Sequence, residues 1–431
     1  MLLIKEHCLL LCPHYLVSNI MKVLMLAPYV TILSRPELSR NKTGFGYMVQ
    51  DIANSVGEKA SVDVLVSDSV GDGFQEGNVH YLAKSYWEFL RNIHNCISPK
   101  VLFSILKKYK MERGTVLRMI YYWLISGYYN RIISRGNYDV VHIHGCNFSN
   151  EIWMKVCEKQ HVKYVITLHA LNSFSDTVIM EPAGKQYERD FFEIVSRGDI
   201  NVSVISTGMK EKIERANGTT NCKNIYVVCN SFTERAINDT DASDEIKDKY
   251  GIPKDAKVIL YAGNISDNKN QKQLVRAFDE LPSSISKNTY VLFCGQDNTG
   301  DDSFKDLVKK SSYSNHFILC GGIDRNQMPR YFTASDCVVL LSVAEGFGLS
   351  LVEGMSFGKP CLSFCDIDAY KDIYTPTAMI GVDERSDVKV AEGITSLLTT
   401  SWDEAAIKEY SKKFNSGQMT DNYINLYNSI N

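Results

Sequence analysis

Two carboxylates that flank a glycine-rich turn are the residues with the clearest chemical potential. Glu345 and Glu353 stand eight positions apart in the stretch 342–360, which reads S-V-A-E-G-F-G-L-S-L-V-E-G-M-S-F-G-K-P. Gly346 and Gly348 leave backbone N–H groups unshielded beside the start of a helix, where anions and sugar hydroxyls can be held. Two isolated glutamates would more often be a loop carboxylate and a solvated helix residue, so the whole stretch has to support a functional interpretation.

The elements around these residues place them at the carboxyl edge of a sheet. Residues 336–342 form a short apolar run rich in valine and leucine, which predicts a buried strand. The apolar residues of 349–355 fit a short helix that Gly358 would end. We therefore expect Glu345 in the loop after the strand and Glu353 inside the helix, at the edge where open α/β sheets bind their ligands.

The stretch 342–360 resembles the signature of the family-4 retaining glycosyltransferases, which have the two-domain GT-B fold. That signature is a Glu, seven residues and a second Glu, with E-G-F-G-L at its start and G-x-P after it, and it is complete here. The resemblance implies that Glu353 binds the ribose hydroxyls of a nucleotide. It also implies that the donor sugar is held by Glu345 and by the amides that follow it: Gly346, Phe347, Gly348 and Leu349.

The chain as a whole has the composition of an ordinary soluble globular protein. Its 431 residues are 45% apolar and 23% charged with a net charge of −3, which suggests two or three domains and gives no indication of a nucleic-acid partner. Its twelve cysteines include no C-x-x-C pair. Neither a metal site nor a disulfide framework is predicted from them, and we expect free thiols in a reducing cytoplasm.

Strands and helices alternate along the chain from Met21 onward, which predicts doubly wound parallel sheets. Strands are predicted at 23–27, 62–67, 79–82, 139–144, 164–168, 201–205, 225–228, 257–263, 290–295, 317–319, 337–341 and 361–364. We expect an upstream extension, two domains and a C-terminal helical segment: 1–20, 21–238, 239–405 and 406–431. The resemblance implies that an N-terminal Rossmann-like acceptor domain faces a C-terminal Rossmann-like donor domain across a cleft, and that the helix at 406–427 crosses back to the first domain.

A glycine-rich turn, Thr43-Gly44-Phe45-Gly46, precedes the first predicted helix. In family-4 enzymes the backbone of a glycine-rich loop at this place approaches the donor diphosphate, usually through a Gly-Gly pair. Here Gly44 matches the second glycine and Thr43 replaces the first. The resemblance implies donor contacts for Gly44 and Gly46, and a simple tight turn is the alternative explanation.

A second loop follows the first strand of the second domain, and its residues from 263 to 269 read G-N-I-S-D-N-K. The family usually has G-R-x-x-x-x-K there, with the Arg and the Lys neutralising the leaving diphosphate. Lys269 is in register, but Asn264 occupies the arginine position, and asparagine donates hydrogen bonds without supplying charge. The resemblance implies donor contacts for Gly263, Asn264 and Lys269, with Lys269 carrying most of the charge. A solvated lysine at a helix start is the alternative.

Three histidines and one acidic triplet also invite a functional interpretation. His169 ends a predicted strand, where family members often have a histidine near the transferred sugar; a loop histidine with satisfied hydrogen bonds is the alternative. His142 and His144 alternate on a strand and so point the same way, but no third metal ligand suggests itself. The Asp-Ile-Asp triplet at 366–368 is of the kind that holds a cation in the other glycosyltransferase architecture, GT-A, but its context here differs. The resemblance implies no metal and no cofactor besides the nucleotide-sugar donor.

The segment 81–135 is strongly basic, with ten Lys/Arg against two Glu and a local net charge of +8. Aromatic residues are interleaved with the basic ones, a pattern that suits an anionic membrane surface. An equally acceptable interpretation is a pair of ordinary helices packed on the N-terminal sheet. We therefore expect a cytoplasmic protein, with peripheral contact to the inner face of the membrane as an open possibility.

The resemblance implies a retaining transferase that moves a sugar from a nucleotide diphosphate to a hydroxyl of a glycan or lipid-linked glycan, in surface polysaccharide biosynthesis. Glu345, His169 and Lys269 would stand at the reacting centre, where positive charge and N–H dipoles stabilise the leaving diphosphate. Two alternatives stay open. One is a sugar-nucleotide epimerase of GT-B fold, and the other is a catalytically silent subunit that binds a nucleotide sugar, for which Asn264 is the best support.

Overall fold

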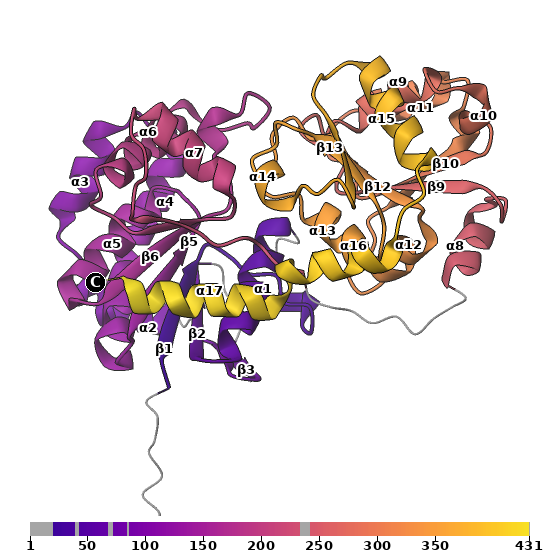
Figure 1. Cartoon of the computed structure of the whole chain (residues 1–431). Helices are drawn as coiled ribbons and strands as arrows, with labels where there is room; N and C mark the ends of the chain where they lie inside the picture. The colour runs from indigo at the N-terminus through magenta and orange to yellow at the C-terminus, as the bar shows by residue number, and fades with distance from the viewer. Residues whose placement is uncertain (1–19, 39–42, 68–71, 84–85, 233–241, 431) are drawn as a thin grey trace, which may run out of the picture.

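The computed structural model describes residues 20–38, 43–67, 72–83, 86–232 and 242–430. The extension predicted over 1–20 therefore lies, apart from residue 20, outside the described residues, as does the predicted domain boundary between residues 238 and 239. The described residues form two α/β domains that lie side by side, with the last helices running along both of them (Figure 1).

The first domain is built on an eight-stranded sheet in the order β3-β4-β2-β1-β5-β6-β7-β8. Its neighbouring strands are parallel except at the edge, where β3 runs antiparallel to β4. The central strands are continuous apolar runs because helices cover both faces of the sheet; Val23, Leu24 and Met25 are all fully buried. The strands are β1 (Lys22–Ala27), β2 (Ser61–Val66), β3 (Phe74–Glu76), β4 (Val79–Tyr81), β5 (Val140–His144), β6 (Lys163–Leu168), β7 (Val202–Val204) and β8 (Ile225–Val227).

The second domain is built on a six-stranded, wholly parallel sheet in the order β11-β10-β9-β12-β13-β14. Its strands are β9 (Lys257–Ala262), β10 (Thr289–Cys294), β11 (Phe317–Gly321), β12 (Cys337–Leu340), β13 (Cys361–Phe364) and β14 (Met379–Val382). The predicted fold class, two Rossmann-like domains that face each other, is confirmed.

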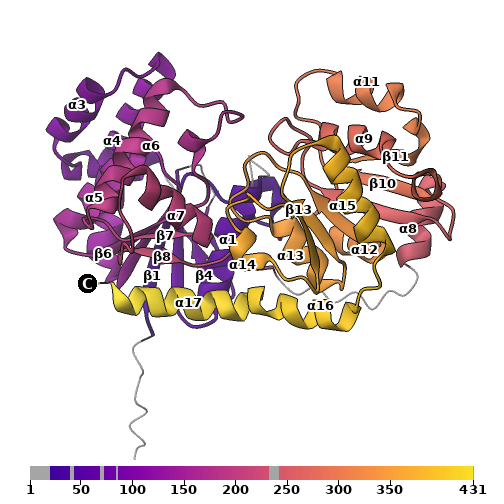
Figure 2. The same ribbon diagram turned by 45° about the horizontal axis from the view of Figure 1, so that its top comes forward.

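Helices connect the strands and cover the sheets (Figures 1 and 2). The first domain contains α1 (Gly44–Gly57), α2 (Tyr86–Asn92), α3 (Pro99–Lys108), α4 (Arg113–Gly136), α5 (Ser149–Gln160), α6 (Pro182–Ser196) and α7 (Thr207–Ala216). The second contains α8 (Ala242–Tyr250), α9 (Gln271–Asp279), α10 (Ser283–Ser286), α11 (Ser303–Lys310), α12 (Met328–Ala334), α13 (Leu349–Ser356), α14 (Tyr370–Ile373) and α15 (Asp387–Thr399).

The C-terminal segment returns to the first domain as two helices, α16 (Glu404–Ser411) and α17 (Ser416–Ser429). Figure 2 shows them as a yellow rod beneath both domains. The predicted crossing is confirmed, but the prediction of one continuous helix over 406–427 is wrong, because the chain leaves the helix at Asn415, whose side chain caps α17 by accepting from the Gln418 N–H. The buried face of α17 carries Met419, Tyr423, Leu426 and Tyr427, at the spacing of one helix face. Together with Ile430 just after the helix, it packs against the core around α1.

Candidate active site

A cavity of about 960 Å³ lies between the two domains, at the carboxyl edges of both sheets. The loops that line it follow β1, β5 and β6 in the first domain and β9, β10, β11 and β12 in the second. Most of the residues that the sequence singled out meet here: Gly44, His169, Gly263, Asn264, Lys269, Glu345, Gly346, Phe347, Gly348, Leu349 and Glu353.

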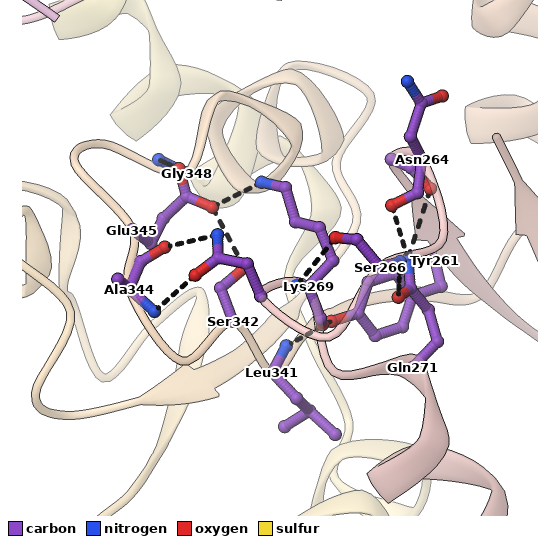
Figure 3. A network of polar contacts seen from close by, with 12 residues as sticks. Tyr261, Asn264, Ser266, Lys269, Gln271, Leu341, Ser342, Ala344, Glu345 and Gly348 are labelled. Atoms are coloured by element: carbon purple, nitrogen blue, oxygen red, sulfur yellow. Dashed lines mark hydrogen bonds and ion pairs between the residues drawn. The ribbon is translucent and has the colours of Figure 1, made fainter. Parts of the chain in front are cut away.

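Glu345 is fixed by the sharp turn that leads from β12 into α13. Gly348 begins this helix in the left-handed region, at φ 84°, a conformation that favours glycine. The turn brings the Gly348 N–H to 3.2 Å from one Glu345 carboxylate oxygen, while the Ser342 hydroxyl lies 3.0 Å from the other. Two donors from the glutamate's own loop therefore hold the carboxylate, as Figure 3 shows.

The third donor to Glu345 comes from the loop after β9. The Lys269 Nζ lies 2.6 Å from the Glu345 carboxylate, and the two side chains are 30% and 14% exposed. Burial raises the pKa of Glu345, but the Lys269 charge and the hydrogen bonds outweigh burial, so the pKa lies below its usual value. Glu345 is thus a carboxylate at neutral pH, and the Lys269 ammonium retains N–H donors beyond the one it gives to Glu345.

Tyr261 and Gln271 hold the loop after β9, which carries Lys269, in place (Figure 3). The buried Tyr261 hydroxyl accepts from the Leu341 N–H at 2.8 Å and donates to the Lys269 carbonyl, which joins the loop to the end of β12. The Gln271 amide donates to the Asn264 carbonyl at 3.1 Å. The loop is therefore held by its neighbours before any ligand arrives.

Asn264 does not substitute for the arginine that the family usually has. Its side-chain oxygen accepts from the Gln296 N–H at 3.0 Å, so it serves the fold of the neighbouring loop. In Figure 3 the Asn264 amide points away from Lys269. The cationic donor on this loop is Lys269.

The first domain presents the start of α1 to the cavity. Thr43 caps the helix, since its hydroxyl accepts from the Gly46 N–H at 3.3 Å, and it also bonds the Tyr29 hydroxyl at 2.8 Å. A side chain built on Gly44 would meet no atom within 4 Å, so the backbone there is open to a ligand. Gly46 faces the other way: a Cβ would lie 2.1 Å from the Thr31 hydroxyl, which makes Gly46 a packing residue, and it does not line the cavity.

Phe347 and Gly346 allow the loop between β12 and α13, which carries Glu345, to pack against the crossover segment and the first domain. The Phe347 side chain is buried, and its ring packs edge-on against Phe414, 5.8 Å away, which ties the loop to the crossover segment. A Cβ on Gly346 would lie 3.3 Å from the His169 carbonyl oxygen of the first domain. A glycine here allows the loop to approach the opposite domain closely.

His169 stands at the end of β6 in a row of three histidine rings. The His169 Nε2 lies 3.2 Å from the His144 Nδ1, and the His142 and His144 rings are 4.1 Å apart. Burial lowers the pKa of His169 to about 4 and that of His142 to about 3, and the pKa of His144 also lies well below its usual value. All three rings are therefore neutral at pH 7, and the pairing of His142 and His144 on one face is confirmed.

His142 links this row to the crossover helix. Its Nδ1 lies 2.7 Å from the Tyr427 hydroxyl on α17, and its Nε2 lies 2.6 Å from the Thr167 hydroxyl. His142 is thus structural, whereas His169 lines the cavity with the Phe45 ring packed edge-on against it at 5.0 Å.

Sequence reasoning missed Arg325, which follows β11 and lines the cavity. Its guanidinium makes two parallel hydrogen bonds, of 3.1 and 2.5 Å, to Asp51 on α1 of the opposite domain. The two side chains are 10% and 7% exposed. No local motif marks either residue; the only usable signal is that Arg325 follows a strand end at the ligand-binding edge.

The Asp-Ile-Asp triplet at 366–368 has its carboxylates engaged with basic side chains. Asp366 pairs with Arg385 at 2.7 Å, and Asp368 pairs with Lys212 of the first domain at 2.5 Å. Across the described residues, no three His, Cys, Asp or Glu side chains are grouped so that they could hold a metal ion.

Residues 242–414 match the family model described as glycosyl transferases group 1. The chain carries a group 1 glycosyltransferase domain. It is 25% identical over 243 residues to a D-inositol 3-phosphate glycosyltransferase of Xylanimonas cellulosilytica, covering 53% of this chain and 56% of that relative. It is 23% identical over 318 residues to a 2-deoxystreptamine N-acetyl-D-glucosaminyltransferase of Niallia circulans, covering 68% and 77% of the two chains. The matched stretch thus spans little more than half of the first of these glycosyltransferases.

Solved structures show that the GT-B fold of this chain extends over both domains. Sucrose-phosphate synthase of Thermosynechococcus elongatus superposes with a TM-score of 0.68 at 15% identity, over 95% of this chain and 98% of the other. HepE of Anabaena, in complex with UDP and glucose, superposes with a TM-score of 0.66 at 16% identity, over 95% and 100%. At these identities the likeness establishes the fold alone.

Proposed function

We propose that this protein transfers a sugar from a nucleoside diphosphate donor to a hydroxyl of a glycan or lipid-linked glycan, with retention of the anomeric configuration. The observation that carries the proposal is the half-buried Lys269–Glu345 pair, which lines the interdomain cavity together with the open backbone of Gly44. Relatives named for glycosyl transfer, and one neighbour solved with UDP and glucose, support a sugar nucleotide as the donor.

The proposed chemistry assigns each group one task. The bond that breaks joins the anomeric carbon to a diphosphate oxygen. The acceptor oxygen forms the new bond to that carbon, and its hydroxyl proton passes to the departing nucleoside diphosphate. Lys269 and the N-terminus of α1 would stabilise the charge on the departing diphosphate. Glu345, held by Ser342 and Lys269, would orient sugar hydroxyls. Its carboxylate already accepts three hydrogen bonds, so it is not poised as a nucleophile.

Glu353 and His169 complete the proposed donor site from opposite sides of the cavity. Glu353 lies within α13 and would accept hydrogen bonds from the ribose hydroxyls. His169 is neutral, so it would contact the sugar without competing with Lys269 for the diphosphate. Because Lys269 and backbone N–H groups supply the stabilising dipoles and charge, we expect turnover without a divalent cation.

The test is a panel of UDP- and GDP-sugars incubated with the full chain, with and without glycan or lipid-linked acceptors. A transferase consumes the donor only when an acceptor is present, and NMR of the product gives the anomeric configuration. Conversion of the donor without any acceptor would identify the epimerase alternative. Nucleotide binding without turnover would identify the silent subunit, which the loss of the family arginine at Asn264 favours.

We also propose that the basic helices of 81–135 contact an anionic membrane surface near the acceptor. Seven large apolar side chains on α2, α3, α4 and the turn between α2 and α3 are exposed: Trp87, Leu90, Ile93, Phe103, Leu117, Ile120 and Tyr121. The same helices expose basic side chains, among them Arg91, Lys100, Lys107 and Arg118. Apolar side chains beside cations are the pattern that binds a headgroup layer. No helix among the described residues meets the length and hydropathy needed to cross a membrane.

Sedimentation with vesicles tests this face. The chain should bind vesicles that contain phosphatidylglycerol and not vesicles of phosphatidylcholine alone. The double variant Phe103→Ser/Leu117→Ser should lose most of the binding, because it removes two side chains that are 66% and 67% exposed. Leu319→Ser, which alters an exposed leucine of the second domain, is the matched control. Equal binding by all three proteins would refute the assignment.

A further inference from the structure

The loops that carry Lys269 and Glu345 are joined by more than their ion pair. The Asn268 side-chain amide donates to the Ala344 carbonyl at 3.0 Å, and its oxygen accepts from the Ala344 N–H at 3.2 Å. The Asn268 backbone carbonyl also accepts from the Val343 N–H at 2.7 Å. Asn268 is therefore paired with Ala344 just as the next residues, Lys269 and Glu345, are paired with each other.

Asn268 is also touched from the opposite domain. The Thr177 hydroxyl donates to the Asn268 side-chain oxygen at 2.8 Å. Thr177 lies between β6 and α6 of the first domain, in the segment that begins with His169. That segment is held by its own domain: the Ser175 hydroxyl accepts from the Thr177 N–H at 3.3 Å, and Lys185 on α6 donates to the Ser175 carbonyl at 3.4 Å.

The Asn268 oxygen thus accepts one hydrogen bond from each domain. An amide oxygen has two lone pairs, so Thr177 and the Ala344 N–H together use its full capacity. The hydrogen bond from Thr177 can exist only when the two domains are closed against each other. When it is made, it fixes the rotation of the Asn268 amide and, through it, the Ala344 peptide immediately before Glu345.

We propose that Asn268 is a positioning residue that aligns the Lys269–Glu345 pair, and that Thr177 makes this alignment depend on domain closure. The inference rests on the proposed function. Displacement of a reacting group by about 1 Å can cost on the order of a hundredfold in rate, so a contact that fixes Glu345 only in the closed state acts on turnover. The Thr177 hydrogen bond therefore links closure of the first domain to the alignment of the donor site. This link limits hydrolysis of the donor while the domains are open.

The hydroxyl of Thr177 is the group to remove. Thr177→Val keeps the shape of the side chain but abolishes its hydrogen bonds to Asn268 and to the Ser175 hydroxyl, and Thr177→Ser retains the hydroxyl. With the full chain, Thr177→Val should lower kcat at least fivefold while the Kd for free UDP or GDP stays within twofold of wild type. Thr177→Ser should restore kcat to within twofold. Thr375→Val, which removes a hydroxyl of the second domain that bonds the neighbouring Thr377 hydroxyl, is the control for the substitution itself.

A second readout does not depend on turnover. The Ala344 amide donates to Asn268, so its hydrogen exchange with saturating nucleotide reports the orientation of the asparagine amide. Exchange there should be at least fivefold faster in Thr177→Val than in wild type and unchanged in Thr177→Ser. If wild type shows no turnover with any donor, the proposed function fails and the exchange result alone decides on Asn268.

Two outcomes would overturn the proposal. One is a Thr177→Val protein whose kcat and Ala344 exchange both match wild type. The other is a parallel loss of nucleotide affinity and thermal stability in Thr177→Val, which would make Thr177 an ordinary structural residue. Asn268→Ala provides the final check, since adding Thr177→Val to it should cause no further loss of kcat if the two residues act through one path.

Discussion

The buried ion pair between Asp51 and Arg325 joins the two domains, and replacing Asp51 with alanine should loosen them. Asp51 lies in the middle of α1, and Arg325 follows β11 in the second domain. The substitution removes the carboxylate that accepts both guanidinium hydrogen bonds, in a place where the arginine side chain is only 10% exposed. With so little of the arginine exposed, solvent replaces the lost partner poorly unless the domains separate.

The expected loss of stability follows from the burial of the ion pair. Two unit charges about 4 Å apart interact by about 4 kcal/mol at an effective dielectric constant of about 20. Breaking a buried pair by deleting one partner costs about 3–5 kcal/mol. Burial lowers the pKa of Arg325, but the charges of Asp51 and Glu353 outweigh it and raise that pKa above its ordinary value. Glu353 still stabilises the Arg325 charge in the variant. We therefore expect Asp51→Ala to destabilise the closed form by about 3 kcal/mol, the lower end of that range. Opening the cleft relieves the cost, so the variant should be both less stable and more expanded.

Urea unfolding and small-angle X-ray scattering measure the two effects. The matched control is Asp421→Ala, which breaks the pair between Asp421 on α17 and Lys59 just after α1. These side chains are 51% and 54% exposed, so the control should cost less than about 1 kcal/mol and leave the radius of gyration unchanged. Adding Arg325→Met to Asp51→Ala should recover part of the loss, because it removes the buried charge. The reasoning is refuted if Asp51→Ala and Asp421→Ala behave alike in both measurements.

Three further predictions concern the site and its surroundings. Glu345→Ala should lower turnover at least tenfold, about 1.4 kcal/mol, in steady-state assays, whereas Glu353→Ala should mainly weaken nucleotide binding in a calorimetric titration; wild-type values would remove either residue from the site. Burial holds the pKa of His142 near 3 and that of His169 near 4, so below about pH 6.5 the unfolded chain takes up protons that the folded chain does not. The free energy of unfolding should have its full value above that pH and fall toward pH 4 by about 1 kcal/mol per histidine and pH unit. Urea midpoints that do not change from pH 7 to pH 5 would contradict this. Excess chelator should leave turnover unchanged, and loss of activity that returns with added magnesium would show that a cation assists Lys269.

The sequence predicted most of the fold because parallel strands covered on both faces must be continuous apolar runs. The two strands it did not predict lack this signal for physical reasons. β3 (Phe74–Glu76) is three residues long, lies at the sheet edge and is partly exposed. β14 (Met379–Val382) contains Gly381, where a Cβ would lie 2.0 Å from the Tyr370 hydroxyl, so close packing interrupts the pattern of side chains.

Within the site, the residues found from sequence are those whose role lies in a local motif. Glu345 and Lys269 were recognisable because each has a fixed spacing to glycines in its own loop. Asn268, Thr177 and Arg325 were not, because each acts through a residue at least 76 positions away, and spacing along a chain carries no information about such contacts. Neighbouring positions in one motif can also differ in use, since Gly44 opens to the cavity whereas Gly46 packs against the loop after β1.

Helix α1 contacts the cavity, the second domain and the crossover helix. Gly44 at its start faces the cavity, Asp51 at its middle holds Arg325, and the carbonyl of Ser55 near its end accepts from Thr420 of α17 at 2.8 Å. A helix of 14 residues is a rod about 21 Å long, so its two ends cannot shift independently. Any rotation of the second domain about the crossover segment therefore changes the place of Gly44 relative to Lys269. Closure of the cleft and assembly of the proposed diphosphate site are one event in this geometry, and the contacts of α1 set how far that event can proceed.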